Sequence, residues 1–256
     1  MNADDFSPSY KNYIKIIHDI KKTGKYKDFA ETLLADEFII MRHDVEFSLE
    51  RAFILSQIES KYGFKSSYFI QITNNAYNAL SMNNIALLRD MYSRGHHIGL
   101  HYHLSGLKDH QRVRDGVRDQ IRILSEMIGI RIDRFSIHRP IKEIYYDKIS
   151  IDGVYNAYAP EYFTFAESID ENTKLDVKYI ADSQHRWNYG TPDDTTFREN
   201  KKIQLLIHPD FWSIDGKDSL ENFRQLIHEN NFSFLNTLDS ECKHFALVKD
   251  IIISKK

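Results

Sequence analysis

The sequence predicts an α/β fold built on a mostly parallel sheet of about seven strands. Short runs rich in β-branched and aromatic residues alternate along the chain with amphipathic stretches of helical length, and this alternation is typical of β–α units. The 256 residues have a globular composition, 42% hydrophobic and 28% charged, with only 10 Gly and 5 Pro. Disorder and low-complexity architectures are therefore excluded.

The predicted helices are bounded by capping signals. Ser48 is a favourable N-cap, and Gly63, Gly95 and Gly129 stand where three apolar-periodic stretches end. The predicted helical stretches are residues 10–22, 48–63, 82–93, 109–128 and 220–229. The last 25 residues are expected to form a mixed extended tail.

Seven strands are predicted from short apolar runs. They are residues 37–43, 66–71, 97–103, 134–138, 154–159, 177–181 and 203–208. The stretch 141–202 combines long loops with short helices, so substrate-facing insertions are expected there. No linker marks a boundary, and residues 1–256 are predicted to form a single domain with residues 1–36 as an N-terminal helical extension.

Charge and hydropathy exclude several classes of partner. The chain carries 34 Lys and Arg against 37 Asp and Glu, a net charge of -3, which does not suggest a nucleic-acid partner. No apolar run approaches the ~20 residues of a membrane span. A single cysteine, Cys242, and an N-terminus without a secretory pattern predict a cytoplasmic protein.

Polar side chains gather where the predicted strands end. Five such clusters occur: His43 with Asp44, His101 with His103, His138 with Arg139, Asp182, and His208. A single polar residue at a strand end usually has a structural role, with its hydrogen bonds satisfied in a cap or a turn. In a barrel of β–α units, however, the carboxyl ends of the strands form the functional face. A purely structural explanation would require all five clusters to lie on this face by coincidence.

The H-x-H pair predicts a metal site. Positions i and i+2 of a strand point to the same side, so His101 and His103 can hold one ion. Two imidazoles and a carboxylate such as Asp44 suit a borderline divalent ion, with zinc as the expected one. Three protein ligands and an open position are what a catalytic site requires.

These clusters lie in motifs that resemble the NodB-type polysaccharide deacetylases, in particular a divergent branch with R-H-D-V-[DE] as its first motif. The motifs run in family order and cover most of the chain: MRHDVE at 41–46, GHHIGLHYH at 95–103, SIHRP at 136–140, Ala181-Asp182-Ser183 with Arg186-Trp187, and LLIHP at 205–209. The resemblance implies a single distorted and incomplete (β/α) barrel of about seven parallel strands. It also implies metal-dependent hydrolysis of an N-acetyl or related acyl group on a sugar.

The resemblance also implies roles for individual residues. His43 stands where better-known members have a carboxylate base, Asp44 stands at the metal-ligand position, and His208 at the position of the acid. The alternative for His43 is an indirect or substrate-contacting role. Arg139 and Asp182 are expected to orient these groups.

The second ligand histidine departs from the family pattern. Better-known members use H-x-x-x-H, but the residue four after His101 is Ser105. His103 is therefore the expected ligand, by its i, i+2 relation to His101.

Substrate contacts are expected from residues that flank the motifs. His138 and Arg186 are candidates, and Trp187 and Trp212 with Phe211 are expected to form a ring-stacking wall for a sugar. The alternative is that these aromatic residues belong to the core.

The leading hypothesis is a metal-dependent carbohydrate deacetylase that acts on a sugar or glycan precursor in surface-glycan or lipopolysaccharide synthesis, with enzymes of glycan assembly as further partners. One alternative is a catalytically degenerate deacetylase fold that binds a carbohydrate or a partner enzyme. A second is an unrelated metal-dependent amidohydrolase or phosphoesterase barrel. Such barrels carry H-x-H on the first strand, whereas here it lies on the third predicted strand.

Overall fold

Residues 7–141, 144, 149–164 and 176–253 are described by the computed structural model. The chain divides into two compact units, 1–216 and 217–256, and each is described by itself. The prediction that residues 1–256 form one domain stays a prediction.

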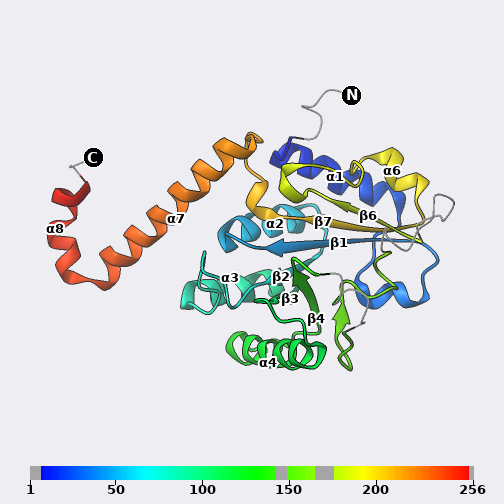
Figure 1. The fold of residues 1–256 in the computed structure, drawn as a ribbon. Coiled ribbons are helices and arrows are strands. Elements are labelled where there is room, and N and C mark those ends of the chain that lie inside the picture. Colours follow the sequence, from blue (N-terminus) through cyan, green and yellow to red (C-terminus); the bar gives the residue numbers. More distant parts are fainter. Residues whose placement is uncertain (1–6, 142–143, 145–148, 165–175, 254–256) are drawn as a thin grey trace. The chain divides into compact units, whose positions relative to one another are not determined.

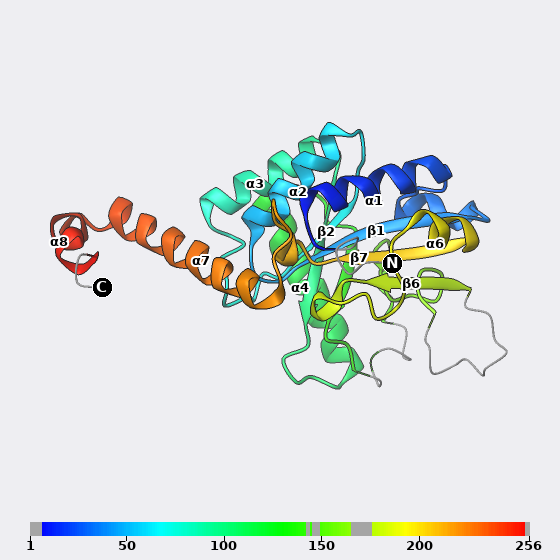
Figure 2. The same cartoon turned by 90° about the horizontal axis from the view of Figure 1, so that it is seen from above.

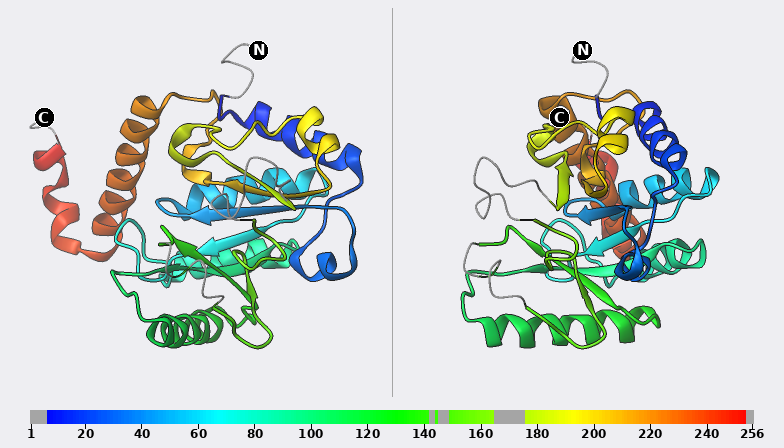
Figure 3. Two further views of the ribbon diagram at one scale, coloured as in Figure 1. Left: turned by 45° about the vertical axis from the view of Figure 1, so that its right-hand side comes forward. Right: turned by 90° about the vertical axis from the view of Figure 1, so that its right-hand side faces the viewer.

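Seven parallel strands form the sheet of the first unit (Figure 1). They are β1 (Phe38–Val45), β2 (Ser67–Ile70), β3 (His97–His103), β4 (Arg134–His138), β5 (Tyr155–Asn156), β6 (Val177–Ala181) and β7 (Lys202–Ile207). The spatial order is β5-β4-β3-β2-β1-β7-β6. The sheet curls into a half-barrel with helices around it (Figure 3), so the predicted incomplete (β/α) barrel of about seven parallel strands is confirmed.

Helices connect the strands and cover the sheet. In the first unit they are α1 (Tyr10–Thr23), α2 (Leu49–Lys61), α3 (Met82–Ser93), α4 (His110–Ile128) and α6 (Asp194–Glu199), with 3-10 turns at η2 (Phe29–Leu34), η4 (Ser183–His185) and η5 (Pro209–Phe211). The expected caps are present. The Ser48 hydroxyl accepts the Arg51 N–H, and Gly129 ends α4 at φ 70°, a left-handed conformation that glycine adopts without strain.

The N-terminal helix packs on the sheet. Figure 2 shows α1 between α2 and α6, and it contacts both helices. Tyr13 and Ile17 of α1 are buried in one apolar cluster with Met41 of β1 and Leu205 of β7.

Side chains of β1 alternate between the two faces of the sheet, as in any strand. Ile39 and Met41 pack under α1, whereas Ile40 lies in a separate cluster that includes Phe69 of β2. By the same alternation His43 shares the face of Met41, and Asp44 shares the face of Ile40.

The C-terminal region differs from the prediction. The second unit consists of α7 (Ser219–Glu241) and α8 (Lys243–Ile253), so the expected extended tail is wrong. The β-branched run at 251–253 favours strand locally, but the packing of α8 against α7 overrides that preference. In the described part of the chain, no helix is both long enough and apolar enough to cross a membrane.

Candidate metal centre

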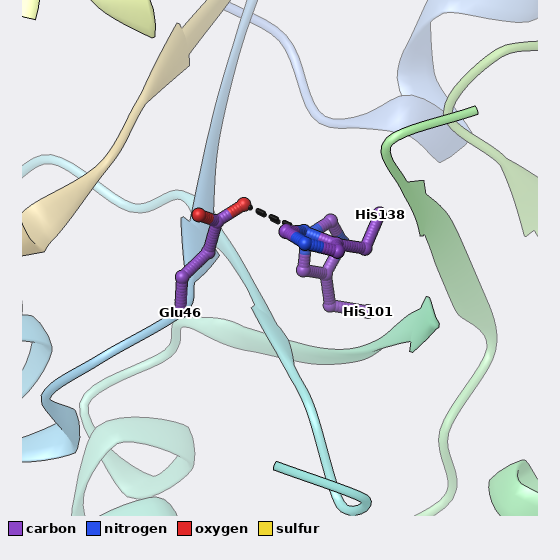
Figure 4. A group of neighbouring side chains, drawn as sticks. All are labelled: Glu46, His101 and His138. Atoms are coloured by element: carbon purple, nitrogen blue, oxygen red, sulfur yellow. Dashed lines mark hydrogen bonds and ion pairs between the residues drawn. The ribbon is translucent and has the colours of Figure 1, made fainter. Parts of the chain in front are cut away.

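Three side chains converge at the carboxyl ends of β1, β3 and β4 (Figure 4). The Nε2 atom of His101 lies 3.2 Å from Nδ1 of His138 and 3.4 Å from Oε1 of Glu46. Nδ1 of His138 lies 2.8 Å from the same Glu46 oxygen. Two nitrogen atoms and one carboxylate oxygen therefore face a common point.

The sheet register brings these residues together. His101 of β3 is paired with Ser136 of β4, and His103 is paired with His138. Glu46 follows the last residue of β1 and begins the turn into α2. The buried Asp210 carboxylate holds that turn by accepting the backbone N–H groups of Glu46, at 3.2 Å, and Ser48, at 2.6 Å.

The spacing of the three atoms fits a divalent cation. Ligand distances of about 2.0–2.2 Å in a tetrahedral site place neighbouring ligand atoms roughly 3.3–3.6 Å apart. The observed 3.2 and 3.4 Å match this spacing, and the third separation is that of a hydrogen bond. Two imidazoles and one carboxylate are also a ligand set found in catalytic zinc sites.

The charge of Glu46 suits the same role. Burial opposes ionisation, but the neighbouring imidazoles of His101 and His138 and the charge of His208 outweigh it and hold the pKa of Glu46 well below its usual range. Glu46 is thus an anion at neutral pH, the form in which a carboxylate binds a metal.

An Asp–His pair lies beside this cluster. Asp182 follows β6 and His208 follows β7, and the Asp182 carboxylate binds Nδ1 of His208 at 2.6 Å. Burial lowers the pKa of His208, but the carboxylates of Asp182, Glu46 and Asp44 have a larger, opposite effect. Together they raise the pKa of His208 to about 9. Its Nε2 lies 3.9 Å from Oε1 of Glu46, so a charged imidazolium faces the cluster.

The candidate cluster differs from the ligand trio predicted from sequence, because only His101 of that trio belongs to it. His103 is exposed, bonded to Ser105 and stacked on the ring of His138 at 5.1 Å. Asp44 lies beneath the cluster, with Oδ2 3.7 Å from Nδ1 of His101. The other two members of the candidate cluster are His138, predicted as a substrate contact, and Glu46.

Glu46 is not among the site residues predicted from the sequence, although the sequence contains a signal for it. It is the last position of the R-H-D-V-[DE] motif. On a strand, positions 44 and 46 share a face, so an acidic residue two beyond Asp44 extends the same polar row.

His43 does not lie at the cluster. Its ring is 0% exposed on the face of β1 that packs under the helices. There Nε2 lies 2.9 Å from Oε1 of Glu59 and 3.2 Å from the Tyr13 hydroxyl. A base must reach the reacting water, whereas His43 is separated from the cluster by the sheet.

The remaining candidates differ in their exposure to solvent. Arg139 and Arg186 are exposed, and Trp187 is half-buried. Trp212 is 1% exposed and donates its indole N–H to Asp182 at 2.9 Å. The expectation that Trp212 stacks on a sugar is therefore corrected, because a ring inside the core offers no face to a ligand.

Fold and site together describe an incomplete (β/α) barrel with a candidate metal centre at the carboxyl ends of its strands. No protein-family model and no curated protein sequence matches the chain.

Several solved structures are similar to a large part of the chain. One is the Xyl-CE4 domain of a multidomain xylanase from the hindgut metagenome of Trinervitermes trinervoides, with 12% identity, a TM-score of 0.43 and coverage of 79% of this chain and 84% of that one. The chitin deacetylase of Colletotrichum lindemuthianum has 14% identity and a TM-score of 0.44, with coverage of 77% of this chain and 83% of that one. A CE4 family pseudoenzyme from Bacillus anthracis has 13% identity and a TM-score of 0.45, with coverage of 78% of this chain and 62% of that one. At these identities the likeness concerns the fold alone.

Proposed function

We propose that this protein is a metal-dependent hydrolase that removes an N-acetyl or related acyl group from a sugar. The observation that carries the proposal is the convergence of Glu46, His101 and His138 beside the charged ring of His208. A cation site and a proton donor are two of the functions that amide hydrolysis needs. The NodB-type motifs that contain these residues supply the substrate class.

Glu46, His101 and His138 would hold the ion, with zinc as the ion best suited to two nitrogen ligands and one oxygen ligand. When bound, a divalent cation polarises a carbonyl oxygen and acidifies water. Asp210 keeps Glu46 in place by holding the turn after β1.

His208 supplies the proton that the departing amine requires. Its Nδ1 is bonded to Asp182, so Nε2 is left to face the reacting group. Asp182 itself is fixed by the Trp212 indole N–H and by the backbone N–H of His208. The His208 imidazole is therefore oriented and positively charged before the substrate binds.

The finer assignments are part of the same proposal. They are a sugar or glycan-precursor substrate, a place in surface-glycan or lipopolysaccharide precursor synthesis, partner enzymes of glycan assembly, and a cytoplasmic location.

A metal-reconstitution assay tests the proposal. Protein stripped with chelator and reloaded with zinc is incubated with a panel of N-acetylated mono- and oligosaccharides, and released acetate is measured. Acetate release that depends on zinc supports a deacetylase. Stoichiometric zinc together with glycan binding, but no release from any member of the panel, supports the degenerate binding module.

We predict that His208→Asn retains zinc but lowers turnover by about 10²–10⁴-fold, the usual value of a general acid. His208 is outside the three-residue cluster, so metal content should equal that of the wild type. The matched control is His97→Asn, at the opposite end of β3, which should leave turnover unchanged. Normal turnover in His208→Asn would remove His208 from the reaction.

A further inference from the structure

We infer that Ser136 and Asp44 are positioning residues that hold His101 in the tautomer whose Nε2 carries a lone pair toward Glu46 and His138. The inference rests on the proposed function, since it concerns how the same site is prepared for an ion. It assigns a role to Ser136, for which sequence reasoning offered none, and a different role to Asp44.

The direction of each hydrogen bond follows from the donors available. The Ser136 hydroxyl lies 3.2 Å from Oδ1 of Asp44 and 2.7 Å from Nδ1 of His101. A carboxylate only accepts, so Ser136 donates its single proton to Asp44. The oxygen of Ser136 must then accept from His101, which places the imidazole proton on Nδ1.

Arg42 holds the start of this hydrogen-bond relay, which runs from Asp44 through Ser136 to His101. Its Nη2 lies 3.2 Å from Oδ2 of Asp44, and the two side chains are 0% and 2% exposed. This ion pair occupies Oδ2 and leaves Oδ1 of Asp44 for the Ser136 hydroxyl. Arg42 also donates to the Tyr158 hydroxyl at 2.7 Å, which locks the guanidinium in place.

The relay ends at the metal centre. With its proton on Nδ1, His101 presents a bare Nε2 that accepts the Nδ1–H of His138 at 3.2 Å. The same nitrogen lies 3.4 Å from the Glu46 carboxylate, which also only accepts, so in this tautomer the two atoms share no hydrogen bond and both can face one cation. Neutral imidazole binds a metal through its unprotonated nitrogen, and partners on the other nitrogen typically change metal affinity by about 10–100-fold. For His101 the partner on the other nitrogen, Nδ1, is Ser136, which is in turn hydrogen-bonded to Asp44.

The fold explains why a serine stands there. His101 and Ser136 are register partners on neighbouring strands, so a short side chain at 136 reaches Nδ1 directly. Ser136 is 0% exposed, and a buried hydroxyl is costly unless it is hydrogen-bonded. Both of its bonds belong to the relay.

The wild-type protein, stripped of metal, provides the first test. Two-bond ¹H–¹⁵N correlation spectra distinguish the two imidazole tautomers, with His101→Gln used to assign the signals. The relay requires His101 to carry its proton on Nδ1. A proton on Nε2 in the wild type would overturn the inference, whatever the protein's enzymatic activity.

Asp44→Asn is the sharpest variant because it reverses the relay. Arg42 must keep an acceptor at the Oδ2 position, which turns the amide NH₂ toward Ser136. Ser136 then donates to Nδ1, and the proton of His101 moves to Nε2. We expect that tautomer in the spectrum and a zinc affinity lowered by about 10–100-fold, measured by competition with a chromophoric chelator.

Ser136→Ala breaks the relay without altering a charge, and keeps the test open if Asp44→Asn does not fold. It should weaken zinc binding, and Ser136→Thr, which restores a hydroxyl, should recover it. The matched control is Ser67→Ala on β2, which removes a buried hydroxyl bonded to Arg134 at 2.7 Å and should leave zinc affinity unchanged.

The outcomes separate this inference from the proposed function. If the wild type binds zinc and Ser136→Ala and Asp44→Asn bind it equally well, the relay is overturned while the metal site stands. If the wild type binds no zinc, the proposed function fails, and the tautomer of His101 alone decides the relay.

Discussion

His138→Ala is expected to abolish stoichiometric zinc binding, whereas His103→Ala is expected to leave it intact. Nδ1 of His138 is one of the three atoms that face the common point. His103 is exposed and bonded to Ser105. Loss of a ligand should exceed the about 10–100-fold cost of losing an outer partner, so affinity in His138→Ala should fall by more than about 100-fold.

The two histidines make a matched pair, because they are register partners on β3 and β4 and their rings stack at 5.1 Å. Zinc content after dialysis and affinity by chelator competition are measured for both variants, with circular dichroism as the check on folding. Equal loss in both would make His103 a ligand, as the H-x-H spacing predicted. Retention of zinc by a folded His138→Ala would remove His138 from the centre.

Glu59→Gln is expected to cost about 3–5 kcal/mol of stability, the range for breaking a buried charged network. Glu59 of α2 is 0% exposed. Its Oε1 accepts from Tyr13 at 2.6 Å and contacts Nε2 of His43 at 2.9 Å. Its Oε2 accepts from Ser66 at 2.6 Å and Tyr68 at 2.8 Å.

Glutamine matches the shape of Glu59 but replaces one of its two oxygen acceptors with an NH₂ donor. The two groups that face this oxygen in the wild type then lose their acceptor and stay buried without a hydrogen bond. Urea denaturation measures the loss. The control is Glu126→Gln, an exposed helix residue paired with Arg122 at 3.2 Å, whose effect should stay within about 0.5 kcal/mol. A Glu59→Gln protein as stable as this control would mean that the network contributes little.

The same network predicts acid lability. Burial raises the pKa of Glu59, but the charge of His43 and hydrogen bonds from His43 and Ser66 lower it more, to about 2. The unfolded chain has a glutamate pKa of about 4.3. Because the folded pKa is the lower one, this stability is fully present above about pH 5 and is lost as the pH falls toward about 2.

Denaturant midpoints measured between pH 7 and pH 2 should therefore fall more steeply for the wild type than for Glu59→Gln, which has no carboxyl to protonate at this position. Parallel curves for the two proteins would place the acid sensitivity elsewhere.

The sequence by itself determined the order of elements and the end of the sheet where the candidate metal centre lies. Apolar runs and caps are local properties, which is why β3, β4 and β6 have the predicted bounds and why Ser48 caps α2 as expected. Because every strand is parallel, the polar residues that follow them share one edge.

Which of those residues meet was decided by the tertiary structure. His43 and Asp44 are consecutive, so a strand must send them to opposite faces; only the packing of α1 and α2 shows that the face of His43 is the covered one. His103 and His138 are opposite one another only through the register of β3 and β4. Periodicity within one strand does not show which residues of the neighbouring strand lie opposite it, and the candidate metal centre combines residues from β3, from β4 and from the turn after β1.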